Sequence, residues 1–175
     1  MKKDPTGLIA RWNSSNGAKQ TNSQTFLSEL CDALCLLQPD FAQTVNEDNI
    51  YSFERGVYVQ GNDVANVSKR FDIYRHGCFL LDAKQGRDAA TLSPGQTSCS
   101  SPVRGLRQWR DTMQQKRKQP ERCVRILSRS ANRLPFVIVV DVGYCFDLYT
   151  DYSCTCGSYL HYPDPRNHRI MLKDL

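Results

Sequence analysis

The sequence of 175 residues has no hydrophobic run long enough to cross a membrane. A membrane-spanning helix needs roughly 20 consecutive apolar residues, and no stretch here approaches that length. The first residues are also not followed by the apolar core of a signal peptide. We therefore predict a single domain over residues 1–175, with no membrane association and a cytoplasmic location.

The sequence also lacks the cysteine spacing of a secreted scaffold, although it contains eight cysteines. We predict free thiols in an intracellular protein. A zinc set can be drawn near the end of the chain from Cys154, Cys156, His161 and His168. Structural zinc sites place their ligands in pairs about two to four residues apart on each side, and this spacing differs. Zinc is therefore disfavoured, and whether Cys154 and Cys156 bind a metal stays open.

Acidic residues are scarce between residues 104 and 133, where ten basic residues stand against two acidic ones. The segment carries a net charge of +8 while the whole chain carries +5, so the remainder is slightly acidic. A basic stripe on such a body indicates a polyanionic partner. The alternative is a solvated helix face. The residues expected to contact the partner are Arg104, Arg107, Arg110, Lys116, Arg117 and Lys118.

Residues 70–85 alternate in polarity like two strands joined by a tight turn. Residues 75–77 suit a three-residue loop with Gly77 in the left-handed conformation. That loop would place Tyr74 opposite Cys78. One face of the hairpin would then be apolar, and it would carry Phe71, Ile73, Phe79, Leu81 and Ala83.

The opposite face of this hairpin would carry Asp72, Asp82 and Lys84. Two carboxylates suit Mg²⁺, which keeps several of its waters when bound to protein. Such a metal lowers the pKa of a bound water and stabilises charge on a phosphate, and a neighbouring lysine can orient that water. The alternative is a surface hairpin with a solvated aspartate and an Asp–Lys pair.

The rest of the chain predicts an α/β core. An apolar stripe predicts a helix over 22–37, ended by Pro39, with Phe26, Leu27, Leu30, Ala33, Leu34 and Leu37 buried. A second helix is expected over 105–127, with a kink or restart at Pro120 and with Leu106, Trp109, Met113, Val124 and Leu127 buried. Strands are expected over 50–59, 136–140, 144–149 and 169–172, and the fully apolar 136–140 should be covered on both faces.

Two segments outside this core are expected to behave differently. Residues 1–21 form an N-terminal extension, in which Leu8, Ile9 and Trp12 could dock as a short element. Residues 86–104 hold many Gly, Ser, Thr and Pro residues and little to bury, so we predict a mobile loop.

The predicted order, with an acid on the second strand and Asp-x-Lys on the third, resembles the PD-(D/E)XK nuclease superfamily. That resemblance implies a restriction-endonuclease-like αβββαβ core, with a central mixed sheet flanked by helices and extra C-terminal strands. More narrowly, the chain resembles the N-terminal nuclease region of MmeI-like (type IIG/IIL) restriction–modification enzymes, which carry a fused adenine-specific DNA methyltransferase. The stretches that carry the likeness are 9–12, 26–31, 51–54, 69–74, 83–85 and 135–143.

The resemblance implies a Mg²⁺-dependent endonuclease, with Mn²⁺ as a substitute, that hydrolyses phosphodiester bonds of double-stranded DNA. It implies Asp72 and Asp82 as metal ligands and Lys84 as the catalytic lysine. Gln85 would contact the phosphate backbone. Glu29 stands where some relatives hold another acid, which makes it a further candidate metal ligand.

The chain departs from the family pattern in three places. Asp82 stands where glutamate is usual, Cys123 where a helix tyrosine is usual, and residues 154–156 where a Gly-containing turn is expected. These departures leave a second hypothesis open, a catalytically impaired nucleic-acid-binding remnant of the same fold.

The sequence has no Gly-rich loop for S-adenosylmethionine and no Asn-Pro-Pro tetrapeptide. We therefore expect the methyltransferase and target-recognition domains downstream, in cis or in trans.

Overall fold

The computed structural model describes residues 5–14, 23–43, 50–59, 67–86, 88, 102–127, 133–153, 155 and 157–175. Its helices are α1 (Thr6–Ser14), α2 (Ser23–Ala33) and α3 (Arg107–Leu127). Its strands are β1 (Tyr51–Val59), β2 (Val67–Arg75), β3 (Phe79–Lys84), β4 (Phe136–Asp141), β5 (Cys145–Thr150), β6 (Leu160–His161) and β7 (Arg169–Met171). A short 3₁₀ turn, Leu172–Asp174, follows β7.

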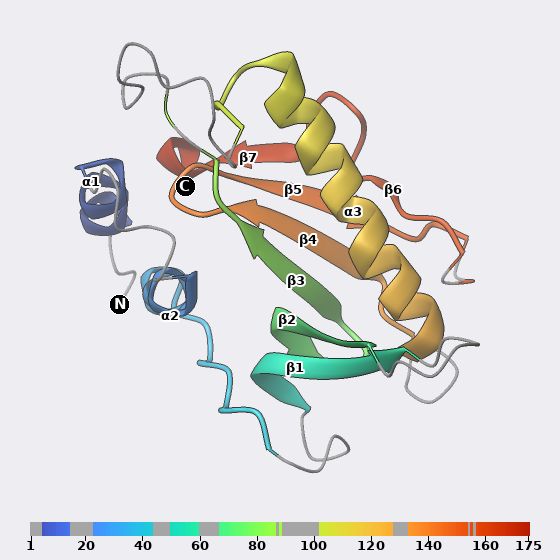
Figure 1. Ribbon diagram of the computed structural model, residues 1–175. Coiled ribbons are helices and arrows are strands. Elements are labelled where there is room, and N and C mark those ends of the chain that lie inside the picture. Colours follow the sequence, from blue (N-terminus) through green and yellow to red (C-terminus); the bar gives the residue numbers. More distant parts are fainter. Residues whose placement is uncertain are drawn as a thin grey trace.

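The strands form one mixed sheet in the order β1-β2-β3-β4-β5-β6, with β7 also paired to β5 (Figure 1). β3 and β4 run parallel and the other described pairs run antiparallel. A parallel pair needs a long crossover, which α3 supplies. The expected order of helix, three strands, helix and strand, with extra strands after it, is confirmed.

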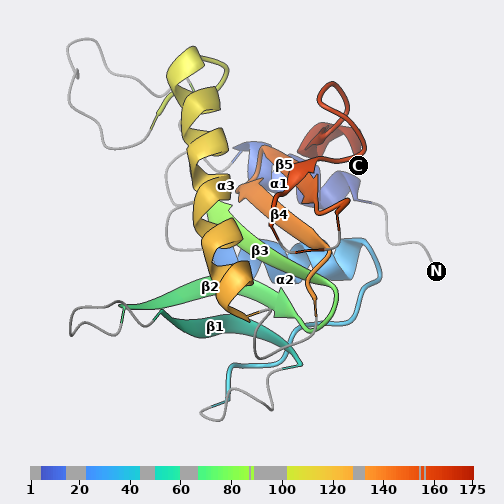
Figure 2. The same ribbon diagram turned by 90° about the vertical axis from the view of Figure 1, so that its right-hand side faces the viewer.

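Helices cover both faces of the sheet (Figure 2). On one face α3 contributes Trp109, Met113 and Val124 to a core with Val137 and Val139 of β4. On the other face, a second core holds the apolar side chains of α1 and α2: Leu8, Trp12, Phe26, Leu27 and Leu30. β4 thus packs on both sides, as its unbroken apolar run predicts.

The hairpin of β2 and β3 is present, but its register differs from the prediction. Arg75 pairs with Phe79, and Tyr74 pairs with Leu80 rather than with Cys78. Gly77 is left-handed as expected, with φ of 63°, although the loop is 76–78 and not 75–77. Each β2 residue therefore pairs two positions further along β3, and an even shift leaves the two faces of the hairpin unchanged.

Phe71 was expected on the face of Ile73, and this is wrong. Phe71 packs with Tyr74 in the core under α3, whereas Ile73 packs in the core under α2. The alternation breaks between them at Asp72, where the β2–β3 pairing has stopped and where Glu54, across on β1, has a left-handed φ of 50°. The strands separate at this break.

The helix α2 ends at Ala33, earlier than predicted. Cys35 takes a left-handed φ of 55°, and the Leu36 N–H donates to the Cys31 carbonyl at 2.8 Å. This is a Schellman ending, which closes the helix before Pro39 is reached. The last two residues of the predicted stripe are consequently exposed, namely Leu34 and Leu37.

The helix α3 is continuous through Pro120, so of the predicted kink or restart the restart is wrong, and a kink stays a prediction. Trp109, Met113 and Val124 are buried as expected. Leu106 precedes the helix and is 57% exposed, so its predicted burial is also wrong. The side chain of Leu127 lies outside the described residues.

The N-terminal extension docks as a helix, which confirms the expectation for its apolar residues. The Trp12 ring meets Phe26 of α2 edge-on at 5.0 Å. Most of the predicted mobile loop lies outside the described residues, as do Cys154 and Cys156 of the zinc set.

Candidate functional site

Asp72 lies at the point where β2 separates from β3. Its Oδ2 accepts the backbone N–H of Ala83 at 2.7 Å, so the carboxylate replaces a strand carbonyl at the break. Its Oδ1 accepts the hydroxyl of Ser23, the first residue of α2, at 3.2 Å. The local separation of the strands thus holds an aspartate between the hairpin and α2.

Asp82 is buried on β3, with 3% of its side chain exposed. Lys84 Nζ donates to its Oδ1 at 2.9 Å, while Oδ2 is buried without a hydrogen-bond partner among the described residues. Burial raises the pKa of Asp82, Lys84 opposes that rise, Asp72 adds to it and Lys116 opposes it. Charged residues of β2, β3 and α3 therefore all act on the Asp82 carboxylate.

Lys84 is the last residue of β3, and β4 fixes its backbone. Its carbonyl accepts the Val142 N–H at 2.9 Å. Its ammonium is held at Asp82 with 29% of the side chain exposed, so it remains accessible from solvent. The next residue, Gln85, has a buried Oε1 without a hydrogen-bond partner among the described residues.

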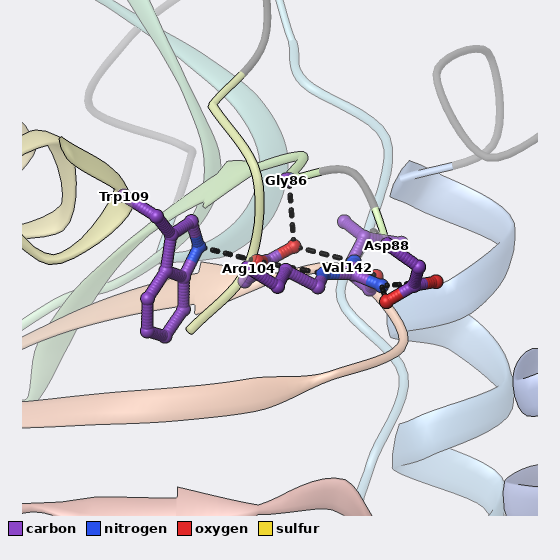
Figure 3. Close-up of polar contacts among 6 residues, drawn as sticks. Gly86, Asp88, Arg104, Trp109 and Val142 are labelled. Atoms are coloured by element: carbon purple, nitrogen blue, oxygen red, sulfur yellow. Dashed lines mark hydrogen bonds and ion pairs between the residues drawn. The ribbon is translucent and has the colours of Figure 1, made fainter. Parts of the chain in front are cut away.

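A second buried carboxylate, Asp141, lies at the end of β4 and was not singled out from the sequence (Figure 3). Its Oδ1 accepts the Gly86 N–H at 2.9 Å and Arg104 at 2.7 Å. Its Oδ2 accepts Arg104 Nε at 3.0 Å and Trp109 Nε1 at 2.8 Å. The sequence held one detectable signal for this residue, a charge directly after a wholly apolar strand. A charge buried with such a strand needs polar partners.

This Asp141 cluster joins the end of β3 to the start of α3. A Cβ at Gly86 would lie 2.6 Å from Asp141 Oδ2 and 2.9 Å from Arg104 Cγ, so only glycine fits there without movement. Gly86 directly follows Lys84 and Gln85. The Asp141 cluster therefore also fixes the point at which these two candidate catalytic residues leave the sheet.

Arg104 belongs to the Asp141 cluster and not to the exposed basic stripe. Only 4% of its side chain is exposed. It also donates to both carboxylate oxygens of Asp88 at 3.1 Å and to the Val142 carbonyl at 2.9 Å. We correct the prediction for this residue, because a buried, fully engaged guanidinium has no face left for a polyanion.

The other stripe residues lie on α3 with different exposure. Arg107 has 93% of its side chain exposed and is 3.9 Å from Asp111. Arg110 and Lys118 are also exposed. Lys116 and Arg117 are partly buried on different flanks, since consecutive helix residues point about 100° apart. Their contact with a polyanion stays a prediction.

Glu29 has structural partners in α1. Its carboxylate accepts Trp12 Nε1 at 2.7 Å and lies 2.5 Å from Arg11. It therefore ties α1 to α2. Metal binding by Glu29 stays a prediction that requires release of at least one of these partners. Across the described ranges, no three His, Cys, Asp or Glu side chains gather closely enough to hold a metal by themselves.

Comparison with known proteins gives one family. A search for similar curated proteins and for similar solved structures found no match. Within the described residues, no helix is long and apolar enough to cross a membrane. The family model described as "MmeI, N-terminal domain" matches residues 4–175. The chain therefore belongs to the MmeI N-terminal domain family, a restriction-enzyme-like region of restriction–modification enzymes.

Proposed function

We propose that the chain is a Mg²⁺-dependent endonuclease domain that hydrolyses phosphodiester bonds of double-stranded DNA. It would be the restriction part of a restriction–modification enzyme, working with methyltransferase and target-recognition domains in cis or in trans. The observation that carries the proposal is the Asp82 carboxylate, buried beside Lys84 and near Asp72, with one oxygen to which no described residue donates a hydrogen bond.

The donor set fits a hard cation. A buried carboxylate oxygen without a donor is costly unless something positive reaches it. Within the part of the chain that the structure describes, Asp82 Oδ2 is such an atom, and the contact of Asp72 Oδ1 with the Ser23 hydroxyl is long, at 3.2 Å. Mg²⁺ or Mn²⁺ bound by these residues would supply a water of lowered pKa and positive charge at the scissile phosphate.

Lys84 has a separate role from the two carboxylates. Its ammonium lies 2.9 Å from Asp82 Oδ1, where it offsets part of the cost of the buried charge. With a cation on the carboxylates, this ammonium is free to hold the attacking water or a phosphate oxygen. Gln85, between Lys84 and the Asp141 cluster, would contact the backbone of the bound strand.

The test is the Lys84→Ala variant, assayed on supercoiled plasmid with Mg²⁺ or Mn²⁺. We expect cleavage to be lost while the fold and Mn²⁺ binding by calorimetry remain, because the carboxylates hold the metal. Lys173→Ala is the matched control, since Lys173 is exposed on the final turn. Cleavage by Lys84→Ala at the wild-type rate contradicts the proposed mechanism.

A metal titration separates this proposal from the non-catalytic remnant. Mn²⁺ binding that is present in the wild type and absent in Asp72→Ala supports the nuclease. If wild-type protein binds no metal at millimolar Mn²⁺ but still binds DNA, the chain is a nucleic-acid-binding remnant and the nuclease proposal is wrong.

A further inference from the structure

A hollow of about 400 Å³ lies between α3 and β6, on the flank of α3 away from Asp82. Its lining is Asp111, Gln114, Gln115, Arg117, Lys118 and His161. Lys116 lies on the other flank, where its charge acts on Asp82. Arg117, one residue on, lies over the ring of Tyr149 on β5 at 5.2 Å. The hollow is therefore separate from the candidate metal site.

The hollow is lined mainly by hydrogen-bond donors. Arg117 and Lys118 supply cationic donors, and the two glutamine amides supply neutral ones. Arg117 Nε lies 3.0 Å from Glu121 Oε1, an ion pair without hydrogen-bond geometry, and the guanidinium also lies over the Tyr149 ring, so it loses little freedom when a ligand binds. Asp111 is the one acidic side chain of the lining, and it lies 3.9 Å from Arg107.

His161 forms the wall contributed by β6, and it belongs to a group of three rings. Its imidazole is 4.3 Å from that of His168 and 5.3 Å from the Tyr149 ring. Burial lowers the pKa of His161, the charges of His168 and Arg117 lower it further, and Asp147 opposes them. These effects favour the neutral ring, and protonation would add a second N–H donor.

The groups that act on His161 come from every element around it. Arg117 of α3, Asp147 and Tyr149 of β5, His168 before β7 and Arg169 of β7 act on or contact the ring, and Asp111 and Lys118 of α3 share the hollow with it. Asp147 is engaged by Arg169 through two contacts of 2.6 Å, so its charge is largely offset. The surroundings of His161 are thus short of negative charge.

We propose that this hollow binds a phosphate group, with Arg117, Lys118 and the glutamine amides as donors and His161 as a donor whose protonation strengthens the binding. An arginine fork beside an ammonium suits a phosphate, which carries several acceptor oxygens. The ligand is either a phosphate of a nucleic-acid backbone or a free phosphate. The proposal does not rest on hydrolysis at Asp82, and its failure leaves the proposed nuclease untouched.

The direct test follows the His161 ring by nuclear magnetic resonance during pH titrations. One arm adds inorganic phosphate and the other a short DNA duplex, with chloride holding the ionic strength constant. We expect the ligand to raise the pKa of His161, and by reciprocity its affinity to rise as the pH falls. Each unit of pKa increase corresponds to about tenfold in affinity. A shift with duplex alone assigns a backbone phosphate, and a shift with both ligands or with phosphate alone assigns a free anion.

Two variants test the lining itself, and a third serves as their control. Lys118→Ala should weaken binding several-fold, and Asp111→Asn should strengthen it by removing the acidic side chain. Both side chains are exposed, so neither change threatens the fold. Lys173→Ala, on the final turn, should change nothing. An unchanged His161 pKa with both ligands at millimolar concentration overturns the proposal, as does wild-type affinity in Lys118→Ala.

Discussion

Replacing Asp141 by asparagine is the sharpest available test of the cluster that joins β3, α3 and β4. The carboxylate is fully buried and accepts four hydrogen bonds from Gly86, Arg104 and Trp109. Both of its oxygens face donors only. In either orientation, an asparagine side chain would therefore point its NH₂ group, which can only donate, at two N–H donors.

The expected loss of stability follows from the buried ion pair. Removing one partner of such a pair leaves the other charge uncompensated, which costs about 3–5 kcal/mol. Arg104 keeps the neutral Val142 carbonyl and the Asp88 carboxylate, whose side chain is 38% exposed and therefore better hydrated. At about 2–4 °C per kcal/mol for a chain of this size, Tm should fall by roughly 6–20 °C.

The assay is urea unfolding of Asp141→Asn beside Asp88→Asn. Asp88→Asn is the matched control, because it removes a partly exposed partner of the same arginine and should cost about 0–1 kcal/mol. The Trp109 indole N–H resonance should move in Asp141→Asn and stay in the control. Equal losses in the two variants, or a loss below about 1 kcal/mol for Asp141→Asn, would refute the reasoning.

Three further predictions follow from burial and charge. Asp82→Asn should raise Tm at pH 7, because burial raises the folded pKa of Asp82 above its usual value. The protonated carboxyl stabilises the fold, and this contribution is lost as pH rises through the folded pKa. The gain in Tm should therefore shrink toward acid, and a lower Tm of the variant at pH 7 contradicts this. Alkylation of native protein should label the exposed Cys35 rapidly and Cys145 only after unfolding, since burial raises the pKa of the Cys145 thiol to about 12; mass spectrometry reads this out. Arg110→Ala should lower the salt slope of DNA binding by about one unit, measured by fluorescence anisotropy, and an affinity insensitive to salt would exclude a phosphate surface.

Local pattern was enough to predict much of this fold. The order of elements, the hairpin, the strand buried on both sides and the shared face of Asp82 and Lys84 all follow from side-chain period, which nearby residues determine. The docking of Trp12 was also predicted correctly.

The errors arose where the chain departs from a regular period. The alternation of β2 breaks between Phe71 and Ile73, across from the left-handed Glu54 on β1, and nothing near Phe71 in the sequence reports it. The helix α2 closes through the left-handed Cys35, although the apolar spacing continues past it. Such backbone reversals carry little signal when the residue is not glycine.

The partners of buried charges were decided by tertiary structure alone. By composition Arg104 belongs to a basic stripe, yet it is paired with Asp141, 37 residues away. The sequence by itself determined which residues alternate, which are apolar and which carry charge. Only the folded chain decided which charges are buried together, because that choice depends on the packing of β3, α3 and β4 and on the desolvation it imposes.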